Sequence, residues 1–401
     1  MTVLCEEKLL PGVAQWADEL TAIRHDFHQH PDLGFDTERT VSKICEYLKA
    51  WGITDIDTEL VKGSVIATVE GNRPGKTIAV RTDIDALPMN DGSCKPWASQ
   101  IEGKSHSCGH DGHMTWVLGA ARYISSHRDF PGKVVFVFQA AEETGIGAKT
   151  LVDAGLIEKY GIDEIYGGHT EPNLDKGDIG MKAGPLQAAA DSVQIIIKGK
   201  GTHGGRPHQG IDTIPVASQI VMALQTIVSR KVDPIECAVV SICSINSGRF
   251  EAFNVVPHQC TLSGTVRTFL PEIRDMVEAK IEKIVKGIAL ANDCEVDYKY
   301  TRYVASVINS EEQTEAAIDA TRKLIGEDHV KIIKPFMSSE DFSEYLAKIP
   351  GSIIRVGIRD ENHNVSLHNQ QFDFNDEVLP LAVSVITNMT LTRLEHLAKV
   401  S

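Results

Sequence analysis

The sequence has no long apolar run, because none of its segments approaches the roughly 18 consecutive apolar residues of a membrane-spanning helix. Positive charge is also scarce. With 40 Lys and Arg against 55 Asp and Glu, the net charge is −15, which argues against nucleic acid and anionic membranes as partners. The segment from Met1 to Leu20 lacks the basic-then-apolar order of a secretion signal.

Cysteines are few and have no framework spacing: the eight are scattered along the chain. Such a pattern is typical of reduced thiols, so we expect a cytoplasmic protein. There is no internal repeat and no low-complexity segment. At 401 residues the chain is too long for one compact core, which predicts two or three domains.

One short segment, from Ser105 to His113, is rich in residue types that bind metal ions. It contains three imidazoles, one thiol and one carboxylate, with two glycines that allow sharp turns. Thiolate and imidazole suit zinc, and imidazole with carboxylate also suits manganese, cobalt or nickel. A helix-like stretch follows from Met114, so we expect the cluster at a strand-to-helix turn.

Further ligand-type side chains follow predicted strands. The apolar run 133–139 reads as a buried strand, and in open α/β sheets ligands bind at the carboxyl ends of the strands. The candidate metal ligands are Cys108, His110, Glu143, His169 and His368. Five ligands are too many for one catalytic zinc, and they fit two ions about 3.5–4 Å apart that share a bridging ligand.

Two adjacent glutamates, Glu142 and Glu143, follow the buried strand and precede Gly145. Neighbouring side chains on a turn point in different directions, so one can bind metal while the other faces a metal-activated water. A carboxylate in that position can take the proton of the water and pass it to a leaving amine.

The pattern changes near Gly184. From Ser192 the predicted order is β-α-β-β-α-β, the order of a ferredoxin-like unit with an antiparallel sheet. The fold class that we predict is α/β, with a central, mostly parallel sheet between helices and an inserted ferredoxin-like α+β domain. The predicted boundaries are 1–186 and 304–401 for the catalytic domain and 187–303 for the inserted domain.

Several of these segments together resemble one known family. They are Asp83 to Pro88, Ser107 to His113, Glu142 to Gly145, Gly168-His169 and Leu367-His368-Asn369. The set resembles the amidohydrolase branch of the aminoacylase/glutamate-carboxypeptidase superfamily, which includes hippurate, auxin-conjugate and N-acyl-amino-acid hydrolases. The resemblance covers nearly the whole chain. Two departures, Gln370 where a proline is frequent and Gly168 where a leucine is common, remove no ligand.

The resemblance implies a dinuclear site held by the five candidate ligands, with Cys108 bridging and Glu142 as general base. It implies a lid in the inserted domain, where His203 would polarise the scissile carbonyl, often across a dimer interface. It also implies that Asn254 and Arg267 bind a substrate carboxylate. Four acidic residues are expected to orient the ligands, in roles left open: Asp83, Asp85, Asp111 and Glu340.

We therefore expect a metal-dependent amidohydrolase that cleaves N-acyl amino acids, hippurate-like or indoleacetyl-amino-acid-like, to a carboxylate and a free amino acid. The expected cofactors are two divalent ions, Mn²⁺ or Zn²⁺, with Co²⁺ or Ni²⁺ as further options, and the expected assembly is a homodimer or a dimer-based oligomer. The alternatives are a dipeptidase or aminopeptidase on the same fold and a metal-binding protein without turnover. The sequence does not identify the acyl group or the amino acid.

Overall fold

The computed structural model describes residues 8–400 and divides into two compact units. Among the described residues, the first unit comprises 8–184, Ile308–Lys334 and 341–400, and the second comprises Pro185–Val307 and Pro335–Glu340. Residues 335–340 thus cluster with the second unit, although the sequence prediction grouped them with the first. Residues 1–7, part of the segment assessed for a secretion signal, lie outside the described range, as does Cys5.

The first unit is built on an eight-stranded sheet in the order β1-β2-β4-β3-β5-β16-β6-β15. The strands are β1 (Ile56–Asp57), β2 (Val65–Glu70), β3 (Arg73–Asp83), β4 (Pro131–Gln139), β5 (Glu164–Asp175), β6 (Ile179–Met181), β15 (Val330–Ile332) and β16 (Gly351–Arg359). The central strands β4, β3, β5 and β16 are mutually parallel. β4 is buried from Val134 onward, as its continuous apolar run predicts.

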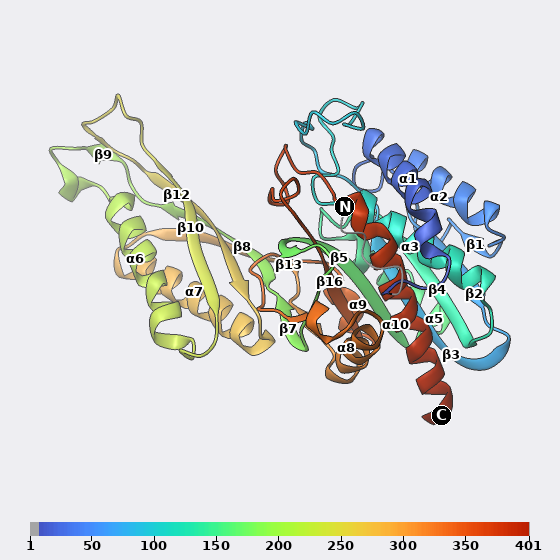
Figure 1. Cartoon of the computed structure of the whole chain (residues 1–401). Helices are drawn as coiled ribbons and strands as arrows, with labels where there is room; N and C mark the ends of the chain where they lie inside the picture. The colour runs from blue at the N-terminus through green and yellow to red at the C-terminus, as the bar shows by residue number, and fades with distance from the viewer. Residues whose placement is uncertain (1–7, 401) are drawn as a thin grey trace. The chain divides into compact units, whose positions relative to one another are not determined.

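Helices flank this sheet (Figure 1). They are α1 (Ala17–Gln29), α2 (Glu38–Ala50), α3 (His110–Ser126), α4 (Gly147–Asp153), α5 (Leu156–Tyr160), α8 (Glu311–Ile325), α9 (Ser343–Leu346) and α10 (Leu379–Val400). The long closing helix α10 packs on α3, α8 and β3. Apolar residues of these helices and of the sheet form one continuous core, which holds the first turn of α3 against the carboxyl ends of β3 and β5.

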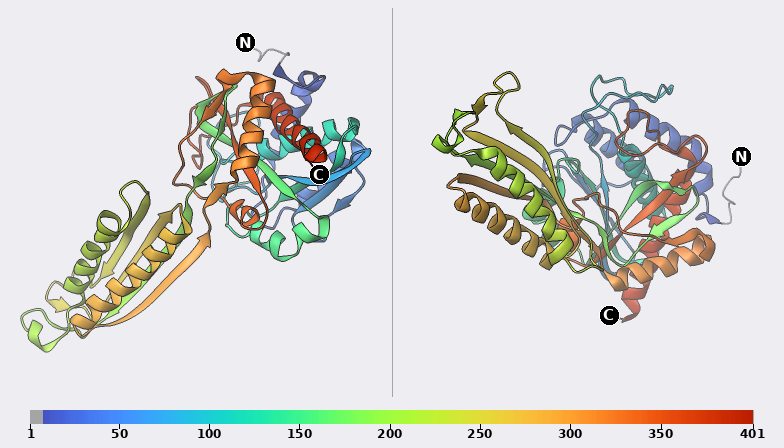
Figure 2. Two further views of the ribbon diagram at one scale, coloured as in Figure 1. Left: turned by 90° about the horizontal axis from the view of Figure 1, so that it is seen from below. Right: turned by 90° about the vertical axis from the view of Figure 1, so that its left-hand side faces the viewer.

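The second unit has a four-stranded antiparallel sheet in the order β10-β12-β8-β13. Its elements are β8 (Ala189–Lys198), α6 (Thr213–Lys231), β10 (Ala238–Ser247), β12 (Gln259–Thr268), α7 (Pro271–Ala291) and β13 (Glu295–Val304). This is the predicted β-α-β-β-α-β order. α6 and α7 lie side by side on one face of the sheet (Figure 2), and apolar side chains from both helices and the sheet form a second core.

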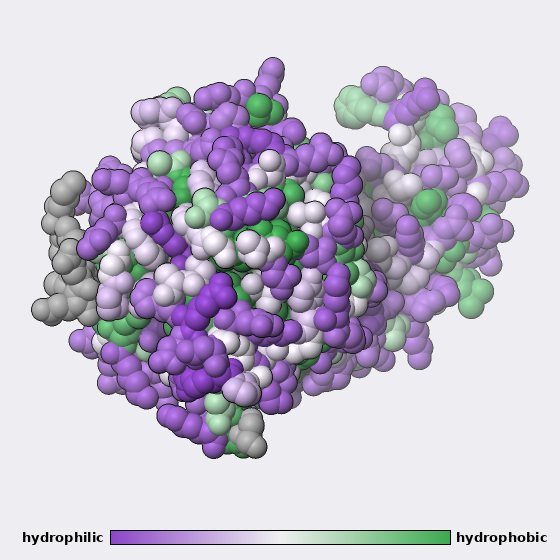
Figure 3. Space-filling model, turned by 90° about the vertical axis from the view of Figure 1, so that its right-hand side faces the viewer, coloured by the Kyte–Doolittle hydropathy of each residue, from purple (hydrophilic) through white to green (hydrophobic). Residues whose placement is uncertain are grey.

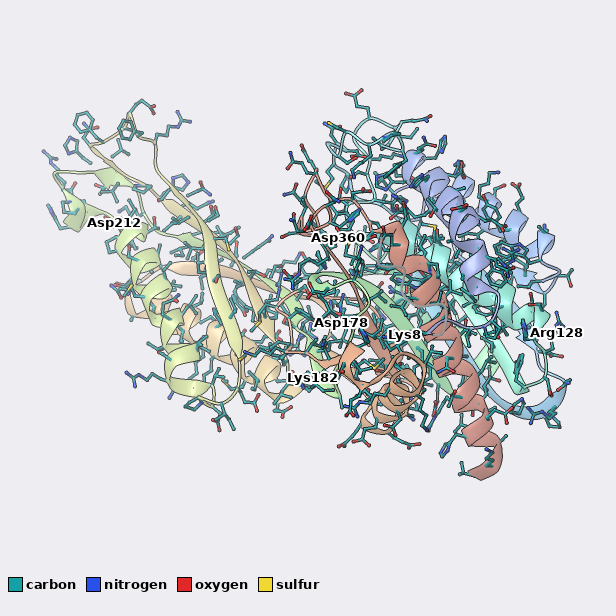
Figure 4. All side chains as sticks on the ribbon, in the orientation of Figure 1. Lys8, Arg128, Asp178, Lys182, Asp212 and Asp360 are labelled. Carbon is teal, nitrogen blue, oxygen red and sulfur yellow. The ribbon has the colours of Figure 1, made fainter. Side chains whose placement is uncertain are left out.

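Shorter elements complete the second unit. β9 (Thr202–His203) and β11 (Val255–Val256) form a two-stranded ribbon beyond the Gln259 end of β12. Asp212, labelled in Figure 4, caps α6 next to this ribbon by accepting a hydrogen bond from the amide of Ile214. Two further strands, β7 (Gly184–Gln187) and β14 (Val307–Asn309), lie where the chain passes between units.

The face of the first unit turned to the viewer in Figure 3 is covered mostly by hydrophilic side chains. Within residues 8–400, no helix has both the length and the apolar character to cross a membrane. The predicted fold class, a mostly parallel sheet between helices with an inserted ferredoxin-like domain, is confirmed.

Candidate metal centre

The first candidate ligands lie on the turn that leads into α3. Gly109 stands between Cys108 and His110 with φ +84°, a left-handed conformation that glycine adopts without strain. A Cβ atom at Gly109 would also lie only 2.8 Å from Cγ2 of Thr170. Because this position has neither the conformation nor the space for a side chain, the thiol and the imidazole on its two sides can enter the same site.

The glutamate pair lies on a strained turn directly after β4. Ala141 has φ +60°, a conformation that costs a non-glycine residue about 1 kcal/mol. The carboxylate of Asp85 offsets part of this cost by accepting hydrogen bonds from the amides of Glu142 (3.0 Å) and Glu143 (3.2 Å). Burial and the nearby Glu143 carboxylate raise the pKa of Asp85 to about 7. Asp85 therefore holds the backbone of the turn from which both glutamate side chains extend.

The five predicted ligands come together as two triads of donor atoms. One triad is Cys108, His110 and His169, the other is Cys108, Glu143 and His368, and within each the donor atoms lie within 4.8 Å of one another. The Cys108 Sγ atom lies 3.6 Å from His169 Nε2, and Glu143 Oε2 lies 3.6 Å from His368 Nε2. Cys108 belongs to both triads, which is the arrangement that a bridging ligand requires.

The two histidines of the first triad are oriented for metal binding by backbone carbonyl groups. Nδ1 of His110 lies 2.8 Å from the carbonyl oxygen of Asp85, and Nδ1 of His169 lies 2.7 Å from that of Thr170. A carbonyl oxygen only accepts hydrogen bonds, so each ring carries its proton on Nδ1 and presents the lone pair of Nε2 to the site. Burial, and then Arg355, lower the pKa of His169 well below its usual value, which keeps this ring neutral.

The charges of the site fit bound cations. Burial, followed by the carboxylates of Glu143 and Glu142, raises the pKa of the Cys108 thiol well above its usual value. A coordinating divalent ion reverses this effect and deprotonates the thiol. Within residues 8–400, the buried Oε1 atom of Glu143 has no hydrogen-bond partner. A buried carboxylate oxygen without a partner is costly, and a metal ion would satisfy it.

His368 differs from the other four candidates because its side chain is 55% exposed. It lies on the loop that follows β16, which begins near Asp360, labelled in Figure 4. Its φ is +59°, and its amide donates a hydrogen bond to the carbonyl oxygen of Ser107 (2.8 Å). This contact joins the last ligand of the chain to the turn that carries the first.

Sequence reasoning missed several buried residues that support the site. His113 contacts Asp83 and the backbone of Thr170. Nδ1 of His28 lies 2.7 Å from Asp111 Oδ2, and the carboxylates outweigh burial and raise the pKa of His28 to about 9. The spacing of His110 and His113, one helical turn apart, was the available signal for the first residue. Nothing near His28 in the sequence indicated its partners.

The three remaining candidates lie in the second unit. His203 and Asn254 are both exposed and are neighbours, because the amide of Gly204 donates to the carbonyl oxygen of Asn254 (2.6 Å). Arg267 lies near the other end of β12, so roughly 25 Å of strand separates it from that pair. The structure therefore brings Asn254 next to His203 but not next to Arg267, although the sequence analysis assigned Asn254 and Arg267 to the same carboxylate.

Arg267 is half-buried and donates to the carbonyl oxygen of Val266 (3.0 Å) and to the hydroxyl of Thr265. Among the described residues, no carboxylate lies within ion-pair distance of it. Arg274 and Arg302 of the same unit are by contrast paired with aspartates. The guanidinium group of Arg267 thus remains available to an external anion.

Comparison with known proteins adds independent findings. Residues 79–392 match the sequence profile described as "Peptidase family M20/M25/M40". The N-acetylcysteine deacetylase of Bacillus subtilis is 37% identical over 94% of this chain and 97% of its own length. The hippurate hydrolase of Campylobacter jejuni is 36% identical over 96% of this chain and 100% of its own length.

One solved structure extends this likeness to three dimensions. The Bacillus subtilis YXEP protein, described as a dinuclear metal-binding peptidase of the M20 family, superposes with a TM-score of 0.84. It is 34% identical, and the match covers 95% of this chain and 99% of that protein. Sequence and fold are therefore similar along nearly the entire chain, including both units.

Proposed function

This chain belongs to peptidase family M20/M25/M40 and is a hydrolase of amide bonds, and from that premise we propose that it cleaves N-acyl amino acids to a carboxylate and a free amino acid. The observation that carries the proposal is the pair of donor triads that share Cys108. Glu142 belongs to neither of these two triads, although its carboxylate also lies within 4.8 Å of donor atoms of His110 and Glu143, and its side chain is only 11% exposed. A carboxylate in that position suits a general base rather than a ligand.

The proposed cofactors are two divalent ions, one in each triad. Such ions, when bound, lower the pKa of a water molecule and polarise the scissile carbonyl group. Glu142 accepts a proton from the attacking water and donates it to the leaving amine. Mn²⁺ and Zn²⁺ suit a donor set of thiolate, imidazole and carboxylate best, and Co²⁺ and Ni²⁺ are alternatives.

The proposed substrate class follows from two arguments. The similar proteins are named for hippurate and for N-acetylcysteine, which both join an acyl group to an amino acid with a free carboxylate. A chain of net charge −15 repels such an anion unless a local cation holds it. Arg267 meets this need, because its planar guanidinium group can donate two parallel hydrogen bonds to a carboxylate.

We further propose that the active form is a homodimer in the cytoplasm. His203 and Asn254 lie roughly 25 Å of strand away from Arg267, and an N-acyl amino acid is much shorter than this. All three residues can therefore contact one substrate molecule only if they come from two copies of the chain. Phe250 and Phe253, beside Asn254, are 97% and 92% exposed, which is typical of a surface that contacts a partner.

A substrate screen tests the activity. Metal-free protein is reconstituted with Mn²⁺, Zn²⁺, Co²⁺ or Ni²⁺, and release of free amine is measured from acetyl, benzoyl and indoleacetyl conjugates of the same amino acids. We expect turnover of at least one conjugate and a preference for one acyl group. The control substrate is a dipeptide with a free amino group. Faster cleavage of the dipeptide would favour a peptidase, and no turnover with any metal would favour a binding protein.

A subunit-mixing experiment tests action across the dimer. Glu142→Gln and His203→Ala are each expected to inactivate the enzyme, for different reasons. Mixed dimers contain one site with both native residues, so part of the activity should return on mixing. Subunit exchange is monitored with differently tagged chains. Complete exchange without recovered activity would show that His203 acts within its own subunit.

A further inference from the structure

His113 lies one helical turn beyond His110 on α3 and is fully buried. Its ring centre is 4.4 Å from that of His169 and 5.2 Å from that of His110. These two neighbours are the histidines of one donor triad, the one completed by Cys108. His113 itself belongs to neither of the two triads that share the thiol, so its role must differ from theirs.

Both ring nitrogens of His113 are engaged in hydrogen bonds. The amide of Thr170 donates to Nε2 (2.9 Å), which requires a lone pair on that nitrogen. The proton of the neutral ring is therefore on Nδ1, which lies 2.7 Å from Oδ1 of Asp83 and donates to it. A ring engaged in this way has no lone pair left for a metal ion.

The two partners of His113 each lie beside one histidine ligand. The N–H of Thr170 donates to His113, and the carbonyl oxygen of Thr170 accepts the Nδ1–H of His169. Asp83 places its other oxygen 3.8 Å from Nε2 of His110. Asp83 has a second support, because Arg81 donates to it (3.0 Å), whereas the Thr170 amide donates to His113.

We infer that His113 is a positioning residue for one of the two metal ions, the one held by Cys108, His110 and His169. The neutral His113 ring links two groups by hydrogen bonds. One is the backbone of Thr170, which orients His169, and the other is the carboxylate of Asp83, which lies beside His110. This inference rests on the proposed dinuclear site. Loss of a partner that orients a ligand typically weakens metal affinity by about 10–100-fold, and here the loss should affect one ion and leave the other, which Glu143 and His368 hold, nearly unchanged.

Two conservative substitutions separate the two halves of the bridge. In His113→Asn the side-chain amide can replace the Nδ1 donor to Asp83, but nothing reaches the Thr170 amide. In His113→Gln the amide oxygen can replace the Nε2 acceptor, but the donor to Asp83 is lost. Because Arg81 also supports Asp83, we expect His113→Gln to retain more of the metal affinity than His113→Asn.

In the experiment, metal-free protein is titrated with Co²⁺ and the binding steps are measured by calorimetry. The ions that remain bound after dialysis are then counted by metal analysis. Wild type should bind two ions in two steps. His113→Asn should weaken one step by about 10–100-fold. The double variant His113→Asn/His169→Ala should weaken one binding step only, because both changes act on the same triad, whereas His113→Asn/His368→Ala should weaken both steps. The free energies of two substitutions within one hydrogen-bond network are not additive. The two double variants are therefore expected to differ, because only His113 and His169 belong to the same network.

Two controls complete the design. Thr115→Ala removes a buried hydroxyl group of α3 that donates to the carbonyl oxygen of Asp111 and should leave both binding steps unchanged. The melting temperature of each metal-free variant reports folding. In metal-free wild type, nitrogen chemical shifts should show His113 with its proton on Nδ1, unchanged when metal is added.

The inference is overturned if both steps weaken equally, if His113→Asn binds two ions as wild type does, or if the His113 nitrogens shift as those of a ligand on metal addition. Wild type that binds fewer than two ions would overturn the proposed dinuclear site, and this inference with it.

Discussion

The two units of this protein differ in where most of their charged and large apolar side chains lie. The first unit buries several charged networks: Arg24 and His28 pair with Asp111, and Arg81 pairs with Asp83 and Asp341, all in its interior. The second unit carries most of the large apolar side chains that are exposed among the described residues, including Ile214, Met222, Ile235, Ile245, Phe250, Phe253, Val255 and Leu290. Buried ion networks fix the positions of charged groups at a cost in desolvation, while exposed apolar groups gain only when another surface covers them.

This contrast indicates that the first unit positions the metal ligands and that the second provides surfaces for contact. The first unit holds ligand atoms in place, since each histidine of the Cys108, His110 and His169 triad is bonded through its second nitrogen. The second unit offers surfaces, with β10 at one edge of its sheet and Phe250 and Phe253 near one end. Substitutions in the first unit should therefore change metal binding and chemistry, and those in the second should change substrate affinity and assembly.

The largest effect is expected at the glutamate pair of the first unit. Glu142→Gln should lower kcat by roughly 10²–10⁴ through loss of the general base while retaining both metal ions. Glu143→Gln should instead weaken metal binding, because Glu143 belongs to a donor triad. Metal analysis and steady-state kinetics on both variants check this. If Glu142→Gln shed metal as Glu143→Gln does, the two roles would be wrongly assigned.

The next effect concerns Arg267 of the second unit. Removing one partner of a buried charged pair costs about 2–5 kcal/mol, so Arg267→Ala should lower kcat/KM for N-acyl amino acids by well over tenfold. The loss should nearly vanish for the matching amides, which have no carboxylate. Arg302→Ala is the matched control, because Arg302 already pairs with Asp275 and Glu278. An equal loss on acid and amide would make Arg267 structural.

A smaller effect is expected for the stability of the first unit at alkaline pH. In the folded protein, Asp111 outweighs burial and raises the pKa of His28 from its ordinary value of 6.5 to about 9. A raised pKa gives stability that is fully present below pH 6.5 and is lost as pH rises through about 9, up to about 3 kcal/mol. His28→Gln should therefore unfold at lower denaturant concentration at pH 6 and lose less stability than wild type between pH 6 and pH 10.

His25→Gln is the control for this prediction. His25 lies on α1, as His28 does, and pairs with Asp376. Its side chain is 23% exposed, and partly exposed ion pairs contribute only about 0–1 kcal/mol to stability. Chemical denaturation at several pH values measures both variants. Parallel stability curves for wild type and His28→Gln would contradict a buried, charged His28.

The smallest effect is expected at the exposed apolar residues of the second unit. Replacing Phe250 and Phe253 by Ser should weaken the proposed dimer by roughly tenfold or more, since aromatic contacts at interfaces often contribute above 1 kcal/mol. Ile235→Ser is the control, because Ile235 is also exposed but precedes β10 at the far end of the sheet. Sedimentation velocity over a concentration series measures this. An unchanged dimer would place the interface elsewhere.

The sequence by itself determined the residue types of the site and the class of fold. The turn from Ser107 to His113 is local, so its thiol and imidazoles are adjacent whatever the rest of the chain does. The buried strand before Glu142 shows in its apolar run, and the alternation of strands and helices from Ser192 shows in its periodicity. From these features the family and the fold could be predicted, together with five candidate donor residues, each of which lies in one of the two triads that share Cys108.

Only the tertiary structure decided how these residues are divided and supported. The grouping of Cys108 with His169 on one side and with His368 on the other depends on strands and loops far apart in the chain. So does the bridge of His113 between β3 and β5, because parallel strands bring residues together through long crossovers. The separation of Asn254 from Arg267 follows from the length of β12. The short motifs that contain these two residues do not indicate how far apart they lie.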